Sequence, residues 1–296
     1  MRPGWKWILR SFNLSLPNNA FAALRELSLQ DCSLSSVTSL LDYMQNSQLV
    51  SIWLSNPWVP GVGVYLQDFA DFLATLAKRC SPRLLHSLSI LDCEHNNLAN
   101  NVTAAQISEI IEHILPFHKL KTIDIHLPYL FTIEDSLIDR LSGAWPELEC
   151  LEIRPQDCLA RCPDPPPITT LAGVVGLTRF PKLQRAHLNV DARGMKYSAI
   201  KEEYKINISS LRHLHLDHSM MDDPVDFAQC LTECFPKVQT FTLWRDGHSR
   251  TTGYTIDEVV RCRAMADEVK KHAWRIWGQS KPILYINSRA FQDWLS

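Results

Sequence analysis

The stretch LRELSLQDCSL, residues 24–34, decides the predicted fold. Leucines stand at its first, fourth and sixth positions, a cysteine at the ninth and a leucine at the eleventh. This completes the pattern L-x-x-L-x-L-x-x-[NC]-x-L, which is typical of leucine-rich repeats. Successive side chains of a strand alternate between its two faces. We therefore expect the leucines to face a core and the residues between them to face away from it.

The six-residue pattern L-x-x-L-x-L recurs along the chain, with Ile, Val, Ala or Phe replacing some leucines. The further copies are Leu49/Ile52/Leu54, Leu85/Leu88/Ile90, Leu120/Ile123/Ile125, Leu148/Leu151/Ile153, Leu183/Ala186/Leu188, Leu211/Leu214/Leu216 and Val238/Phe241/Leu243. Successive copies begin 25 to 36 residues apart. Three of these seven spacings exceed the usual length of ~20–29 residues, so we expect a helix and loop insertions in each unit.

Two further signals mark where strands and helices begin. An aromatic residue stands three positions before the opening apolar residue in five of the eight units, at Phe21, Phe117, Trp145, Phe180 and Phe235. In three of them proline follows directly, which stops a helix and extends the chain. Helix starts are predicted by Thr103-x-x-Gln106 and Thr132-x-x-Asp135, which resemble capping boxes, and by Asp223-Pro224, an N-cap followed by proline.

These signals predict an α/β fold of the leucine-rich-repeat solenoid type, a horseshoe with a curved parallel sheet on its concave side and helices on its convex side. We expect three parts: residues 1–23 as an N-terminal cap or partial repeat, residues 24–254 as about eight repeats, and residues 255–296 as a C-terminal helical cap. The Pro-rich segment 163–167 is interpreted as a loop insertion and not as a linker between domains.

Composition limits the classes of partner. The chain has 30 basic and 32 acidic residues, a formal net charge of −2, so we expect neither a nucleic-acid nor a membrane partner. Its nine cysteines are scattered without the dense spacing of a secreted disulfide framework and are predicted to be reduced. We find no signal peptide and no apolar segment of ~18 residues, which favours a cytoplasmic or nuclear location.

The alternation of L-x-x-L-x-L strands, aromatic-Pro joints and long irregular units resembles the F-box/leucine-rich-repeat proteins of mushroom-forming fungi, over roughly residues 9–245. The resemblance implies a substrate receptor, in which an F-box docks to the Skp adaptor of a cullin ubiquitin ligase and the repeats hold the target. The F-box segment itself is missing: Leu16-Pro17 precedes two asparagines and no helical pattern follows. We therefore expect Skp and cullin as partners only if an F-box is encoded upstream of Met1.

The residues between the leucines supply the candidate binding surface. Those in the middle of the expected strands form one outward column, and those after the last leucine form a second. From these columns we predict a protein-binding patch on the concave face. Its residues are Trp53, Asp124, Glu152, His187, His215 and Trp244. The two tryptophans are the expected anchors, because outward aromatic side chains often dominate binding energy.

The sequence signals for a metal or catalytic site are weaker than those for the binding patch. His213, His215 and Asp217 alternate along one strand with His187 nearby, a set able to bind a transition metal, but no motif fixes a fourth ligand. We predict no metal and no cofactor, and leave that cluster open. Neither G-x-S-x-G nor H-E-x-x-H occurs, and Gly61-Val62-Gly63 lacks the rest of a phosphate loop.

The leading functional prediction is a protein-binding scaffold, in the form of the target-binding part of an F-box-type ubiquitin ligase receptor. The alternative is a free-standing regulator or sensor, of GTPase-regulator or immunity type, unconnected with ubiquitination. An enzyme is not expected, because no nucleophile, base or phosphate loop stands in a recognisable context. The sequence gives neither the bound target nor the oligomeric state.

Overall fold

The computed structural model describes residues 21–44, 47–55, 66–91, 103–127, 133–155, 169–203, 209–216, 220–242 and 271. Within these ranges, strands and helices alternate along the chain. The strands of the main sheet are β1 (Glu26–Gln30), β2 (Ser51–Ser55), β3 (Ser87–Leu91), β4 (Thr122–Leu127), β5 (Cys150–Pro155), β6 (Arg185–His187), β8 (His213–His215) and β10 (Thr240–Thr242). The helices are α1 (Leu34–Tyr43), α2 (Leu66–Arg79), α3 (Ala104–Glu112), α4 (Asp135–Ala144), α5 (Leu171–Gly176), α6 (Tyr197–Glu203) and α7 (Pro224–Cys234).

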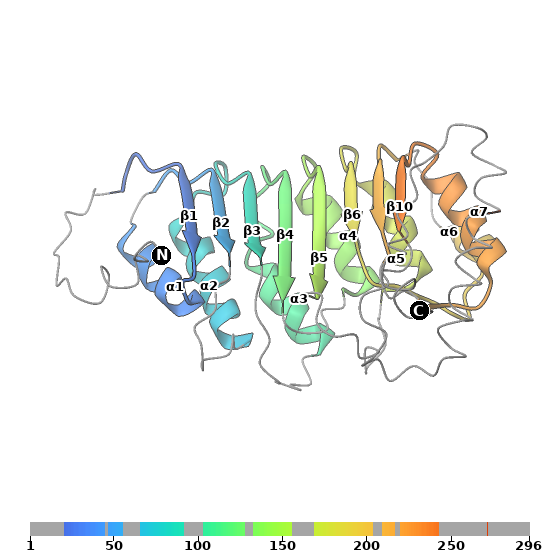
Figure 1. Cartoon of the computed structure of the whole chain (residues 1–296), viewed down its shortest axis with the longest axis horizontal. Helices are drawn as coiled ribbons and strands as arrows, with labels where there is room; N and C mark the ends of the chain where they lie inside the picture. Colours follow the sequence, from blue (N-terminus) through green and yellow to red (C-terminus); the bar gives the residue numbers. More distant parts are fainter. Residues whose placement is uncertain are drawn as a thin grey trace, which may run out of the picture.

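The main sheet has eight strands, and every neighbouring pair is parallel. In Figure 1 the strands stand side by side in chain order from β1 to β10, with helices α1 to α5 behind them. The short strands β7 (Asp191–Ala192) and β9 (Met220–Met221) form a separate parallel pair. All eight strands that the sequence predicted are present and parallel, so that prediction is confirmed.

The predicted leucine-rich-repeat solenoid is nevertheless wrong as a fold class. The described residues form an α/β fold with a single all-parallel eight-stranded sheet alternating with helices, an alternation shared with Rossmann-type and TIM-type folds. The successive units are also unlike one another, because helix length ranges from 14 residues in α2 to 6 in α5 and two of the connections pair as a second sheet.

The reason for this error is physical. Alternating apolar residues report a strand that packs one face against helices, and any parallel strand covered on that face produces the same pattern. The pattern therefore located the strands correctly. It carried no information on whether the units share one geometry and curve into a horseshoe.

The apolar residues of the six-residue pattern form the core between the sheet and the helices. The second apolar residues of the pattern, from Ile52 to Leu214, are fully buried, and so are its opening residues from Leu49 to Leu211. Burial of each such side chain contributes about 1.5–3 kcal/mol. This continuous apolar layer is what holds each strand at a fixed place in the sheet.

The aromatic joints turn the chain into the strands as predicted. Phe117 and Trp145 are fully buried, and their carbonyl groups accept hydrogen bonds from the amides of Leu120 (3.0 Å) and Leu148 (3.1 Å). The indole Nε1 of Trp145 donates to the carbonyl of Ile114 at 3.3 Å, which satisfies its polar group inside the core. Each joint thus fixes where the following strand begins.

Two of the three predicted helix starts are confirmed. Thr103 and Gln106 form a reciprocal capping box, and the Asp223 side chain caps α7. The third is wrong, because α4 begins at Asp135 after the N-cap residue Glu134. The Asp135 carboxylate instead accepts hydrogen bonds from the amide (2.8 Å) and hydroxyl (2.6 Å) of Thr170.

Other sequence predictions meet the structure only in part. The predicted terminal segments 1–23 and 255–296 lie almost wholly outside the described residues, so these boundaries stay predictions. Five cysteines are described and none of them forms a disulfide, namely Cys32, Cys80, Cys150, Cys230 and Cys234. Among the helices that the structure describes, none has the length and apolar character needed to cross a membrane.

Candidate functional site

One row of side chains crosses the sheet on the face opposite the core, with one residue from each of the seven strands β1 to β6 and β8. Strand register aligns the central residues of neighbouring strands across seven strands. We call this set the polar row: Ser28, Trp53, Ser89, Asp124, Glu152, His187 and His215. Because side chains alternate along a strand, the polar row faces away from the buried leucines. Neighbouring members stand about 4.8 Å apart at the backbone.

The polar row contains five of the six residues predicted to bind a partner. Asp124, Glu152, His187 and His215 lie on successive strands of the sheet, while Ser89 separates Trp53 from Asp124. Trp244, the sixth, lies outside the described residues. Their juxtaposition follows from the sequence alone, because the repeated pattern fixes both the face and the register of each residue.

Trp53 has an unusual setting on β2. Its side chain is 37% exposed, whereas Ile52 and Leu54 on either side of it in sequence are buried in the core. Serines surround it on the same face: Ser28 and Ser89 across the neighbouring strands, and Ser51 and Ser55 along its own strand. The indole is therefore partly covered by its neighbours and partly open to solvent, on a face where the residues around it have short side chains.

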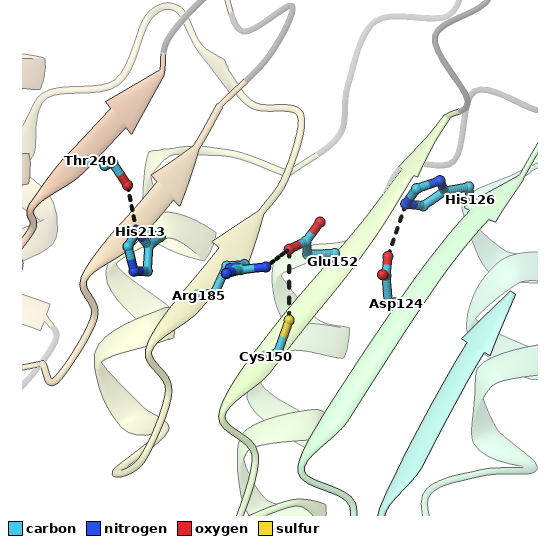
Figure 2. Close-up of polar contacts among 7 residues, drawn as sticks. All are labelled: Asp124, His126, Cys150, Glu152, Arg185, His213 and Thr240. Atoms are coloured by element: carbon cyan, nitrogen blue, oxygen red, sulfur yellow. Dashed lines mark hydrogen bonds and ion pairs between the residues drawn. The ribbon is translucent and has the colours of Figure 1, made fainter. Parts of the chain in front are cut away.

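A charged group occupies the middle of the polar row. Glu152 is buried and its Oε1 lies 3.4 Å from Arg185 Nη1 and 3.7 Å from the Cys150 thiol, as Figure 2 shows. Burial, followed by the charge of Glu152, raises the pKa of Cys150 to about 12. A thiol held neutral in this way is a poor nucleophile, so Cys150 is not a candidate for covalent catalysis.

His126 joins this group from β4. Its Nε2 lies 2.9 Å from Oδ1 of Asp124, two residues earlier on the same face of the strand (Figure 2). His126 directly follows Ile125, the last apolar residue of its copy of the pattern, and so belongs to the second outward column, but it was not among the residues predicted to bind. The signal was present, because residues two apart share a strand face and Asp124 aligns with Glu152 on β5.

Three imidazoles lie at the other end of the polar row. The rings of His187 and His215 have centroids 5.4 Å apart and are tilted by 34°. Nδ1 of His213 lies 2.6 Å from the hydroxyl of Thr240, and burial, followed by the nearby Arg185, lowers the pKa of His213. This end of the face therefore presents aromatic rings with polar edges.

The predicted histidine cluster is only partly brought together. His187, His213 and His215 lie on neighbouring strands, but Asp217 is outside the described residues. Within the part of the chain that the structure describes, the group with metal-ligand spacing is a different one, formed by Asp124, His126 and Glu152. The face thus carries an apolar anchor, an acidic centre with one imidazole, and an imidazole-rich end.

Comparison with known proteins does not identify a family for this chain. No family model matches the chain, and no curated protein matches it. The resemblance to F-box/leucine-rich-repeat proteins therefore stays a prediction, and the interpretation of the face rests on its geometry.

Proposed function

We propose that the chain binds another protein through the polar row, with Trp53 as the apolar anchor. The observation that carries this proposal is the exposed indole among four serines, on a strand whose other face supplies the core. The exposed part of the ring is an apolar surface open to a partner. Tryptophan is also among the residues most often found to dominate the energy of protein interfaces.

The charges of the face define the kind of partner. Asp124 and Glu152 stand two and three strands from Trp53, about 10–15 Å away along the sheet. A matching partner presents an apolar side chain to the indole and a hydrogen-bond donor or positive group to Asp124, whose side chain is 25% exposed, whereas Glu152 is buried. Nucleic acid is disfavoured, because the acidic centre would repel a phosphate backbone and the chain has a net charge of −2.

The more specific form of the proposal comes from the resemblance noted in the sequence. It is a target-binding role in a cullin-type ubiquitin ligase, in the cytoplasm or nucleus. The Skp adaptor enters this role only through an F-box encoded upstream of Met1. A pull-down with purified Skp tests that part separately, since target binding by the polar row does not require the adaptor.

The experiment starts with proximity labelling in cells to find partners, followed by titration calorimetry with each purified candidate. Trp53→Ala should weaken binding of the genuine partner by about 2 kcal/mol, which is roughly a 30-fold increase in Kd. Tyr43→Ala is the matched control, because Tyr43 is 66% exposed but lies at the end of α1, away from the polar row. The proposal fails if Tyr43→Ala weakens binding and Trp53→Ala does not.

A further inference from the structure

Three potential metal ligands converge beside the middle of the polar row. One ligand atom each from Asp124, His126 and Glu152 lies within 4.8 Å of the other two. Zinc sits about 2.0–2.2 Å from nitrogen and oxygen ligands, so tetrahedral ligand atoms are roughly 3.4 Å apart. The His126 Nε2 to Asp124 Oδ1 distance of 2.9 Å already falls below that spacing. Small side-chain rotations would bring all three atoms around one ion.

Burial separates this group from ordinary surface carboxylates. Glu152 and His126 are each only 9% exposed, and both come from strands inside the sheet, which fixes their backbones. Oδ1 of Asp124 is buried too, and it forms an ion pair with His126 Nε2 at 2.9 Å. A divalent cation would bind both the carboxylate oxygen and the imidazole nitrogen.

The ligand types select the class of ion. Two carboxylates and one neutral imidazole balance a divalent charge, and imidazole favours zinc and its neighbours in the first transition row over magnesium or calcium. We propose that Asp124, His126 and Glu152 form a binding site for a divalent transition-metal ion, with Zn²⁺ as the test ion. This proposal does not depend on the protein-binding function proposed above.

Three protein ligands leave at least one coordination position open. A bound ion would complete its coordination there with water or another donor atom. Arg185 does not fill the site, because its side chain is half exposed and meets Glu152 from the β6 side at 3.4 Å. Within this group the guanidinium acts as an outer partner that orients the Glu152 carboxylate.

In the first experiment, the metal-stripped, untagged full chain is titrated with Zn²⁺ alone, and calorimetry measures the heat of binding. We expect one saturable equivalent and a rise in Tm with added Zn²⁺. Loss of an outer partner commonly weakens a metal site 10–100-fold, so loss of a ligand should weaken it at least about 100-fold. His126→Ala, Asp124→Asn and Glu152→Gln should each show this loss, and none should show the rise in Tm.

Matched controls locate the site. His213→Ala removes an imidazole from the same face, where it pairs with Thr240, and should bind Zn²⁺ as the wild type does. The double variant His187→Ala/His215→Ala removes the two tilted, neighbouring rings and should also bind Zn²⁺ as the wild type does. The proposal is overturned if the wild type binds no equivalent of Zn²⁺. It is equally overturned if the double variant abolishes binding while the near-isosteric Asp124→Asn and Glu152→Gln chains retain it.

Discussion

The two faces of the same strands differ in what they hold. On β5, Leu151 and Ile153 lie in the core, whereas Cys150 and Glu152 belong to a network of polar contacts on the opposite face. The first face is uniformly apolar and lies against helices, and the second combines an exposed indole, carboxylates and imidazoles. Residues adjacent in sequence therefore have separate roles, so each face can be changed while the other is left intact.

The largest expected effect contrasts two neighbours on β5. Leu151→Ala should destabilise the fold by about 2–5 kcal/mol, because it opens a cavity in the apolar layer. Glu152→Gln should change the free energy of unfolding far less, since the amide has nearly the same shape and Arg185 is half exposed. Urea unfolding of both variants measures the difference. Equal losses would mean that the polar face also holds the fold together.

Two helical glycines test how closely the helix layer is packed. A Cβ at Gly173 would stand 2.2 Å from Asp135 Oδ1 and 2.8 Å from Thr169 Cγ2, so Gly173→Ala should cost about 1–3 kcal/mol. A Cβ at Gly143 meets nothing within 4 Å, so Gly143→Ala should stabilise by roughly 0.5–1 kcal/mol through helix propensity. Thermal unfolding compares the two variants, and a loss of stability in both would contradict this account.

A smaller, pH-dependent effect is expected from Asp135 on the helix side. Burial raises the pKa of this carboxyl above its ordinary value of 3.8, although hydrogen bonds from Thr170 oppose the shift. The Asp135 carboxyl therefore keeps its proton to a higher pH in the folded state than in the unfolded state. Its contribution to the free energy of unfolding falls as pH rises above about 3.8, and it levels off above the folded pKa. Asp135→Asn should lose this dependence, because the amide does not titrate and still accepts from the Thr170 amide. A pH series of unfolding free energies that is the same for both chains would contradict the assignment.

The smallest expected effect concerns thiol reactivity, compared between the helix side of the sheet and the polar face. Burial raises the pKa of Cys80, next to α2, to about 11, and that of Cys150, on the polar face, to about 12. Both thiols should react with iodoacetamide at pH 8 at least about tenfold more slowly in the native chain than in urea, since only the thiolate reacts. Peptide mass spectrometry over time gives the two rates. Rapid native labelling of Cys150 alone would show that the centre of the polar face is more open than described.

Particular residues show how far the sequence could predict this molecule. The repeated leucines located every strand of the main sheet, and the same pattern set the register that aligns Trp53, Asp124 and His215 along one row. The register could be predicted because a shift of one residue in a strand would turn its leucines out of the core.

The same residues also show why the rest was not predictable. The apolar pattern indicates that one face of a strand is buried. It says nothing about how the helices that bury this face differ in length, so the predicted fold class was wrong. The place of His126 on the polar face follows from strand alternation, but its closeness to Glu152 across β4 and β5 does not, because side-chain distances are not written in residue spacing. The Asp135 to Thr170 contact spans 35 residues and has no local signal.

Photo-crosslinking from single positions tests the central claim that the polar face, and not the helix layer, receives a protein partner. A photoreactive phenylalanine analogue placed at Ser28, which is exposed beside Trp53, should crosslink to the partner, whereas the same analogue at Tyr43 on α1 should not. Both sites tolerate a large side chain, because both are exposed. Crosslinking from the Ser28 position alone is the predicted result. Efficient crosslinking from the Tyr43 position, with none from Ser28, would contradict the account.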